Sequence, residues 1–231
     1  LGTYGDFGTY SFFYSHQITS GEGGMITCHN KEDYELLVSL RSHGWSRSNN
    51  KNEYKKVAKK YPKLDPRYIF INQGFNLRPT DVQAAMGLNQ FERLDKFINI
   101  RINNRKKIIE SLKKDPRWKN QYRFIQVPKN IEPSFMGLPI FLNENMTKEI
   151  KTKLLLYLEA KGIETRPILT GNFLNQPSIK LFGLNNEKLK FKGAQSIEDL
   201  GFLIGLHTKE INQKQLSLIK NSLLFIDSLS K

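Results

Sequence analysis

Hydrophobic and polar positions near the start of the chain follow a strand-like pattern and then change to a helical spacing. Residues 7–14 and 24–28 favour strands, because both are rich in apolar and β-branched residues and a polar, Gly-rich stretch separates them. Residues 31–44 are typical of a helix that ends at Gly44. No period is sustained over residues 45–75, so we expect a long loop there, of the kind that often carries function.

The longest amphipathic pattern covers residues 78–114. It opens with Pro79 and with a capping box formed by Thr80 and Gln83. Its apolar positions recur at helical intervals: Phe91, Leu94, Ile98, Ile102, Ile109 and Leu112. We expect one long helix, straight or bent, that bridges two domains.

The rest of the chain alternates short strands with helices. Strands are predicted near 122–127, 135–142 and 163–166, and helices over 147–161 and in two later segments opened by Ser196 and Asn212. The sequence therefore predicts an α/β domain in residues 1–113, with the long helix, and a small α+β domain in residues 114–231. Two or three strands are too few for a stable open sheet with helices on both faces, so we expect the first domain to be the C-terminal part of a larger one.

Composition narrows the class of protein. The 231 residues carry a formal net charge of +14, but no nucleic-acid motif, so a solvated basic surface that favours anionic substrates is the simpler interpretation. No segment approaches the roughly 18 apolar residues of a spanning helix, and the first residues lack a signal core, so we expect a cytoplasmic protein without a membrane partner. The single Cys28 can form neither an intramolecular disulfide nor a Cys-based metal site, and we expect no metal.

A histidine lies where the first strand gives way to the Gly-rich loop. In the stretch SFFYSHQITSGEGGM, Ser11 is followed by His16 and then by the segment GEGG. An imidazole carries protons near neutral pH, which makes His16 a candidate base. A lone histidine is more often a structural residue, so its position alone leaves both interpretations open. We expect the acid of Glu22 to bond amides of its own loop.

Four segments together resemble the DegT-type family of nucleotide-sugar aminotransferases. They are GTYGDFGTYSFFYSHQITSGEGGMI (2–26), SHGW (42–45), GFNLRPTDVQAAMGLNQFERLD (74–95) and RPILTGNFLNQP (166–177). The resemblance covers most of the chain and implies an α/β fold, the fold type I of pyridoxal phosphate-dependent transferases, as in aspartate aminotransferase. The chain would then supply the C-terminal part of the large domain and the small α+β domain.

The residue at position 16 separates two branches of that family. Ordinary members have a lysine there that forms the Schiff base with the cofactor, whereas His16 resembles the branch of sugar 3-dehydratases. Imidazole cannot hold an aldehyde covalently, so the resemblance implies non-covalent pyridoxal 5'-phosphate or pyridoxamine 5'-phosphate, with L-glutamate as amino donor. It also implies that His16 is the base in removal of the 3-hydroxyl from a nucleotide-linked 4-keto-6-deoxyhexose, with GDP as the favoured nucleotide. A 3,6-dideoxyhexose for surface polysaccharide would be the product.

The same resemblance assigns further site residues, each with a structural alternative. Ser11 matches the serine that donates to the cofactor phosphate, and is otherwise a strand residue. Asn76 matches an asparagine that reaches the phosphate from a partner subunit, which implies a homodimer, and is otherwise a helix cap. His43 matches a histidine on the substrate side, and otherwise interacts with a helix C-terminus. Gly171 and Asn172, in the turn TGNF, are expected to bind the sugar, and otherwise form a plain turn.

Some features depart from the family pattern. Gln17 stands where related dehydratases often have a second histidine. The family's phosphate-binding Gly-rich turn, its aromatic residue on the pyridine ring and its aspartate at the ring nitrogen all precede the strand with which this sequence starts. An iron–sulfur 3-dehydrase is disfavoured by the single Cys28, and a transaminase by the lack of lysine between Leu1 and Asn30. A pseudoenzyme or a dimerisation fragment without turnover stays open as the alternative.

Overall fold

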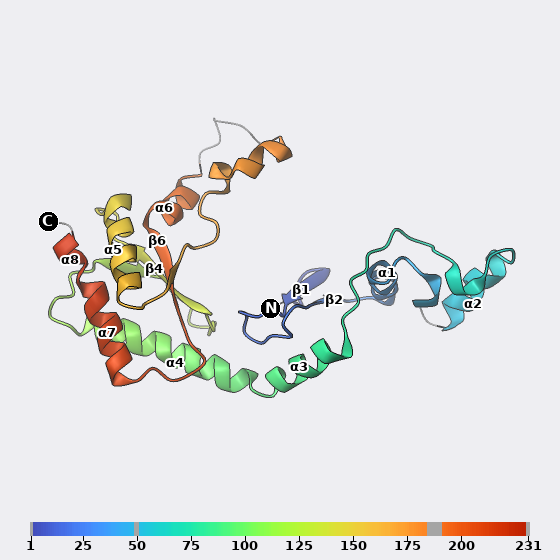
Figure 1. The fold of residues 1–231 in the computed structure, drawn as a ribbon, viewed down its shortest axis with the longest axis horizontal. Helices are drawn as coiled ribbons and strands as arrows, with labels where there is room; N and C mark the ends of the chain where they lie inside the picture. The colour runs from blue at the N-terminus through green and yellow to red at the C-terminus, as the bar shows by residue number, and fades with distance from the viewer. Residues whose placement is uncertain (1, 49–50, 184–190, 230–231) are drawn as a thin grey trace. The chain divides into compact units, whose positions relative to one another are not determined.

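The computed structural model describes residues 2–48, 51–183 and 191–229. They form two compact units, Leu1–Leu94 and Asp95–Lys231, each of which is described by itself (Figure 1). Helix α4 (Leu94–Lys113) buries Ile108 and Leu112 in the core of the second unit, so by packing it belongs there. The predicted division into domains 1–113 and 114–231 stays a prediction.

The first unit contains a two-stranded antiparallel sheet followed by helices. Strand β1 (Phe7–Ser11) pairs with β2 (Gly24–Cys28), with Ser11 opposite Gly24. The helices are α1 (Lys31–Arg41), α2 (Lys51–Lys60) and α3 (Asp81–Phe91), with 3₁₀ turns at Ser46–Ser48 and Pro66–Tyr68. Thr80 and Gln83 form the predicted capping box of α3, which satisfies amides that have no partner inside the helix.

Two predictions for this unit are wrong in extent. The first strand ends at Ser11 rather than at residue 14, because the backbone at Phe12 turns into a closed loop. Residues 45–75 are not one loop, since α2 occupies their centre. This helix has exposed lysines on one side, while Tyr54 and Val57 on the other are half-buried, and its short apolar stripe gave no sustained period in the sequence.

The long helix predicted over residues 78–114 is two helices, α3 and α4. After Phe91 the amide of Arg93 donates to the carbonyl of Gln90 at 3.0 Å, a bond that spans three residues instead of four. Such a tight turn ends the α-helical pattern, and α4 begins at Leu94. The hydrophobic period continues across the break, which explains why the sequence did not reveal it.

Two stretches of the first unit, residues 42–46 and 69–77, run side by side as a backbone ladder. Hydrogen bonds of 2.9 Å join the amide and carbonyl of His43 and Phe75, Ile71 and Gly44, and Ser46 and Ile69. A Cβ on Gly44 would lie 2.0 Å from the carbonyl oxygen of Asn72, and a Cβ on Gly74 would lie 1.9 Å from the carbonyl carbon of His43. Neither position admits a side chain, so the two glycines permit the close approach.

The second unit is built on a four-stranded antiparallel sheet. In spatial order its strands are β3 (Tyr122–Phe124), β4 (Gly137–Leu142), β6 (Gly201–Gly205) and β5 (Thr165–Arg166). Its helices are α4, α5 (Lys148–Ala160), α6 (Lys192–Leu200), α7 (Gln213–Leu224) and α8 (Ile226–Leu229), with 3₁₀ turns at Phe173–Asn175 and Pro177–Phe182. The sequence missed β6, a short apolar run that periodicity cannot tell from a helix, and α6 begins at Lys192 rather than Ser196.

The core of the second unit lies between the sheet and its helices (Figure 1). Alternate residues of β4 and β6 share one face of the sheet, and they are buried against α4, α5 and α7: Leu138, Ile140, Leu142, Phe202, Ile204, Ile108, Leu112, Leu154, Leu158 and Leu223. The hydroxyl of Tyr122 donates to the carbonyl of Leu223 at 2.6 Å, and burial raises the pKa of this phenol. In the part of the chain described, no helix is both long enough and apolar enough to cross a membrane.

Replacing Leu154 tests this core. Leu154→Ala is expected to lower the free energy of unfolding of the second unit by about 2–5 kcal/mol, because it leaves a cavity under α5. Leu156→Ala is the matched control on the same helix, since Leu156 is 65% exposed and its loss changes the free energy by no more than about 0.5 kcal/mol. Urea unfolding followed by Trp118 fluorescence, in a Trp45→Phe background, measures both. Equal losses would contradict the assigned core.

Replacing Gly44 tests the backbone ladder. Gly44 and Gly21 share a left-handed backbone, with φ of +75° and +82°, but the nearest atom to a Cβ on Gly21 is Met86 Cε at 3.9 Å. Gly21→Ala is therefore expected to lower the free energy of unfolding only through the cost of its left-handed backbone, about 1–2 kcal/mol. Gly44→Ala is expected to destabilise the first unit more, because its Cβ overlaps backbone as well. Unfolding followed by Trp45 fluorescence, in a Trp118→Phe background, compares them, and equal effects would show that the ladder tolerates a side chain.

Candidate functional site

The loop between β1 and β2 presents His16. Backbone hydrogen bonds close the loop, from the amide of Phe12 to the carbonyl of Gly23 (2.8 Å) and from the amide of Ser20 to the carbonyl of Phe12 (3.0 Å). The amide of His16 donates to the carbonyl of Phe13 (3.0 Å), and the ring centroids of these two residues lie 5.8 Å apart in an edge arrangement. Position 16 is thus held by bonds that do not depend on its side chain.

The imidazole of His16 is half-buried, and its two nitrogens have different surroundings. Nδ1 is buried and has no hydrogen-bond partner among the residues described. Burying a polar atom without a partner costs about 1–3 kcal/mol, so a folded protein rarely leaves one unless a ligand or a function requires it. Nε2 is the nitrogen that remains for exchanging a proton with a bound molecule.

The glycines that follow His16 meet the demands of a tightly folded loop. A Cβ on Gly23 would lie 2.3 Å from Oγ of Ser20. That hydroxyl donates to the carbonyl of Glu22 (3.0 Å), and Nε2 of Gln83 on α3 donates to the same carbonyl (2.8 Å). Both of these bonds go to the backbone carbonyl of Glu22, whereas the sequence led us to expect bonds from loop amides to its acid. Through Gln83, α3 supports the loop that carries His16.

Aromatic and cationic side chains gather around Trp45. This Trp45 cluster consists of His43, Trp45, Arg47 and Arg78. The rings of His43 and Trp45 lie 4.9 Å apart, and the guanidinium carbons of Arg47 and Arg78 lie 4.6 Å and 5.6 Å from the Trp45 ring centroid. Nη2 of Arg78 donates to Nε2 of His43 at 3.4 Å, which places the proton of that imidazole on Nδ1. Both arginines are exposed, and such a pair beside an aromatic face suits an anionic ligand.

Sequence reasoning missed Arg47 and Arg78. Arg47 lies two residues after the segment SHGW, and Arg78 lies within the segment that begins GFNLRP, two residues after Asn76; this proximity was the available signal. What the sequence could not show is that the backbone ladder joins these segments, with a bridge between Ser42 and Asn76. The structure therefore brings His43 and the exposed Asn76 together, while Ser11 and His16 share the hairpin.

The other two predicted residues lie in the second unit. Gly171 has a φ of +71°, and Asn172 is only 8% exposed. Oδ1 of Asn172 accepts a hydrogen bond from the amide of Leu174 (3.2 Å), and its Nδ2 donates to Oε1 of Gln195 (3.0 Å). Both polar ends of this side chain are engaged inside the protein, so the turn offers a ligand its shape and backbone rather than the Asn172 carboxamide.

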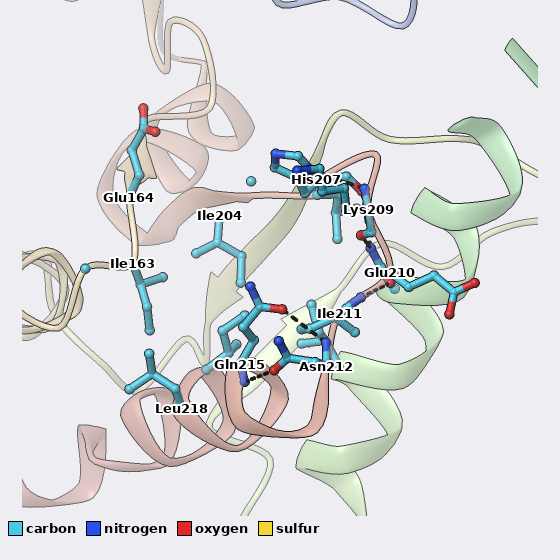
Figure 2. A pocket seen from close by; sticks show the side chains of 16 residues that line it. Ile163, Glu164, Ile204, His207, Lys209, Glu210, Ile211, Asn212, Gln215 and Leu218 are labelled. Carbon is cyan, nitrogen blue, oxygen red and sulfur yellow. Dashed lines mark hydrogen bonds between the residues drawn. The ribbon is translucent and has the colours of Figure 1, made fainter. Parts of the chain in front are cut away.

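A cavity of about 590 Å³ opens elsewhere in the second unit (Figure 2). Its wall includes the aliphatic side chains of Ile163, Ile204 and Leu218, and the capping box of Asn212 and Gln215 lies at its edge. The described residues that line it include none of the six site residues predicted from the sequence.

The groups around the hairpin fit the cofactor that the family resemblance implies. Ser11 is exposed at the end of β1, and because its oxygen accepts from the amide of Phe13 (3.4 Å), its O–H can donate to a phosphate oxygen. The exposed carboxamide of Asn76 offers a second donor. The sequence has no lysine between Leu1 and Asn30, so the hairpin offers no side-chain amine for a covalent link. This donor set suits a cofactor held by hydrogen bonds.

Comparison with known sequences identifies a family for this chain and proteins that it resembles. The model of the DegT/DnrJ/EryC1/StrS aminotransferase family matches residues 1–221. GDP-4-keto-6-deoxy-D-mannose 3-dehydratase of Escherichia coli O55:H7 is 30% identical over 210 residues, which are 91% of this chain and 52% of that protein. The chain thus spans about half the length of the curated relatives it matches.

Solved structures lead to the same fold. GDP-4-keto-6-deoxy-D-mannose-3-dehydratase of E. coli with bound hydrated PLP has a TM-score of 0.77 at 28% identity, over 96% of this chain and 55% of that one. GDP-4-keto-6-deoxymannose-3-dehydratase with a trapped PLP-glutamate geminal diamine has a TM-score of 0.76 at 26% identity, over 96% and 56%. The predicted α/β class and aminotransferase-like fold are confirmed. With a family match that covers nearly all of its length, this chain belongs to the DegT/DnrJ/EryC1/StrS aminotransferase family.

Proposed function

We propose that this protein removes the 3-hydroxyl group from a GDP-linked 4-keto-6-deoxyhexose, with a pyridoxal phosphate or pyridoxamine phosphate cofactor held without a covalent bond. One observation carries the proposal: the hairpin loop presents His16, with its Nδ1 buried and unpaired, in a segment that has no lysine. The 3-dehydratase of E. coli that is 30% identical to the chain supports the same reaction.

When bound, the cofactor supplies an amine for the sugar ketone and a ring that withdraws electrons from it. Ser11 and Asn76 donate hydrogen bonds to the phosphate, which takes over the anchoring that a covalent lysine gives elsewhere. The family resemblance implies that Asn76 does so from the second subunit of a homodimer; in this chain Asn76 is bridged to Ser42, beside His43. Through Nε2, His16 would take up the proton that the amine-bearing carbon of the bound cofactor gives up, and would donate it to the departing 3-hydroxyl, which leaves as water. Hydrolysis would then release the nitrogen as ammonia together with a 4-keto-3,6-dideoxy sugar, and L-glutamate would restore the amino group and leave as 2-oxoglutarate.

The Trp45 cluster fits the charged part of the substrate. The diphosphate of a GDP-linked sugar carries negative charge, and exposed guanidinium groups of Arg47 and Arg78 match phosphate oxygens in pairs. His43 keeps its Nε2 occupied by Arg78, so it orients that arginine. The formal net charge of +14 adds a long-range attraction for such an anion.

His16→Asn is the direct test of the base. Loss of a general acid–base is expected to lower kcat for 3-dehydration about 10²–10⁴-fold, while the absorbance of bound pyridoxal phosphate still changes on addition of L-glutamate. His29→Asn is the matched control, because His29 is an exposed histidine of the same unit whose Nε2 lies 3.0 Å from the carbonyl oxygen of Gly5. Its kcat should equal that of the wild type.

Three outcomes would overturn the proposal. A bond to the unmodified protein that borohydride reduces would show covalent attachment, and His16→Lys is the variant expected to create one. A wild-type kcat for 3-dehydration in His16→Asn would show that His16 is not the base. A wild-type protein that responds to neither glutamate nor keto sugar would instead favour the pseudoenzyme or dimerisation role.

Arg47→Gln tests the diphosphate site. Loss of a charged donor is expected to raise KM for the GDP-linked sugar about tenfold or more, with kcat little changed, because the contact is made equally before and during the reaction. Arg67→Gln is the control, since Arg67 lies over an aromatic ring in the same way, 6.0 Å from the Tyr68 centroid, but pairs with Asp65 at 2.6 Å. The dependence of KM on salt concentration should become weaker for Arg47→Gln but not for Arg67→Gln. Equal effects of the two variants would contradict the assignment.

A further inference from the structure

Hydrogen bonds attach the turn from Gly171 to Asn175 to one face of α6. The backbone amide of Asn172 donates to Oε2 of Glu198 at 2.9 Å, and Nδ2 of Asn175 lies 3.0 Å from both carboxylate oxygens of Glu198. Oε1 of Gln195 accepts from Nδ2 of Asn172 (3.0 Å) and from Nδ2 of Asn175 (3.1 Å). Gln195 and Glu198 are three residues apart, so they share one side of the helix and clamp the turn together.

The turn is also too close to Glu198 to carry a side chain at its apex. A Cβ on Gly171 would lie 2.7 Å from Cβ of Glu198 and 2.9 Å from its Oε2, and Gly171 has a left-handed backbone. The glycine therefore lets the chain pass over Glu198 closely enough for the next amide to reach the carboxylate. Leu169, 84% exposed, and Phe173, 47% exposed, point the apolar part of the turn outward.

A buried lysine fixes α6 itself. Lys151 on α5 is 9% exposed, and its ammonium donates to the backbone carbonyl of Glu198 and lies 3.5 Å from that of Gly201. Removal from water lowers the pKa of Lys151, and carbonyls at the C-terminal end of a helix are the partners that a cation there prefers. Glu198 thus holds the turn through its side chain, and Lys151 holds Glu198 through its backbone carbonyl.

We propose that Glu198 is a positioning residue, which keeps the Gly171–Asn175 turn in the conformation that receives the sugar of the substrate. This inference rests on the proposed function, because it takes the turn to border the sugar. Charge makes the anchor effective: a carboxylate accepts several N–H bonds at once, and bonds to a charged acceptor are stronger than neutral ones. Asn172 then serves the site by shaping the turn.

Glu198→Gln is the first variant, because it keeps the size of the side chain and removes its charge. The amide of Asn172 is expected to exchange hydrogen with water about tenfold faster than in the wild type, since its acceptor is weakened. KM for the GDP-linked keto sugar should rise by about tenfold or more. The spectral response of the cofactor to L-glutamate should not change, because that half of the reaction proceeds without the sugar.

Two further variants make the result specific. Glu198→Ala should show the same changes more strongly, and a thermal melt shows whether the unit still folds. Glu144→Gln is the control, since it removes an exposed carboxylate of the second unit that pairs with Arg123 at 2.9 Å. It should alter neither the exchange at Asn172 nor KM.

The outcomes separate the two proposals. Unchanged exchange at Asn172 in Glu198→Gln would overturn the anchor, whatever the enzyme does. Faster exchange with unchanged KM would overturn the positioning role, because the turn would be loose without affecting the sugar. A wild-type protein that converts no sugar would end the proposed function and the positioning role with it, while the exchange result would still decide whether Glu198 anchors the turn.

Discussion

The close backbone approach between residues 42–46 and 69–77 is the constraint on which the first unit depends. Among the hydrophobic residues described there, only Ile69 is fully buried, so this unit has little apolar core of its own. Backbone hydrogen bonds, each worth about 0.5–1.5 kcal/mol net, supply much of its order instead. They act in pairs along the ladder, which requires glycine at 44 and 74. The position of Trp45 and of the cations around it follows from that requirement.

The second unit is stabilised instead by the burial of apolar side chains. Its sheet buries whole aliphatic side chains against α4, α5 and α7, and burial of one such side chain contributes about 1.5–3 kcal/mol. By contrast, α3 has no buried residue, with Val82 71% and Leu88 69% exposed. The bond from Nε2 of Gln83 to the carbonyl of Glu22 ties α3 to the hairpin of the first unit. Substitutions in the second unit therefore disturb the packing of its core, whereas substitutions in the first unit disturb its backbone geometry.

Much of this structure could be predicted from local signals along the chain. The caps at Thr80 and Asn212 predicted where α3 and α7 begin. In each, the side chain of the cap and that of the glutamine three residues later bond each other's backbone amides, so the signal is local. The break between α3 and α4 has no such signal, and β6 became a strand only through its neighbours β4 and β5. The same limit applies to the site. His16 could be singled out from its own loop, whereas the link between His43 and Asn76 depends on residues more than thirty positions apart, and Glu198 on a contact between a turn and a later helix.

The identity of residue 16 is a matter of chemistry rather than folding. The loop that holds it is closed by backbone bonds at Phe12, Gly23 and Ser20, and the backbone bond that residue 16 adds uses its amide, which any residue except proline could supply. Nδ1 of His16 is buried without a partner among the described residues, and a hydrocarbon of similar shape would avoid that penalty, so packing does not favour histidine here. Under the proposed function, histidine in place of lysine at position 16 alters what this loop offers a ligand: a proton carrier in place of an amine.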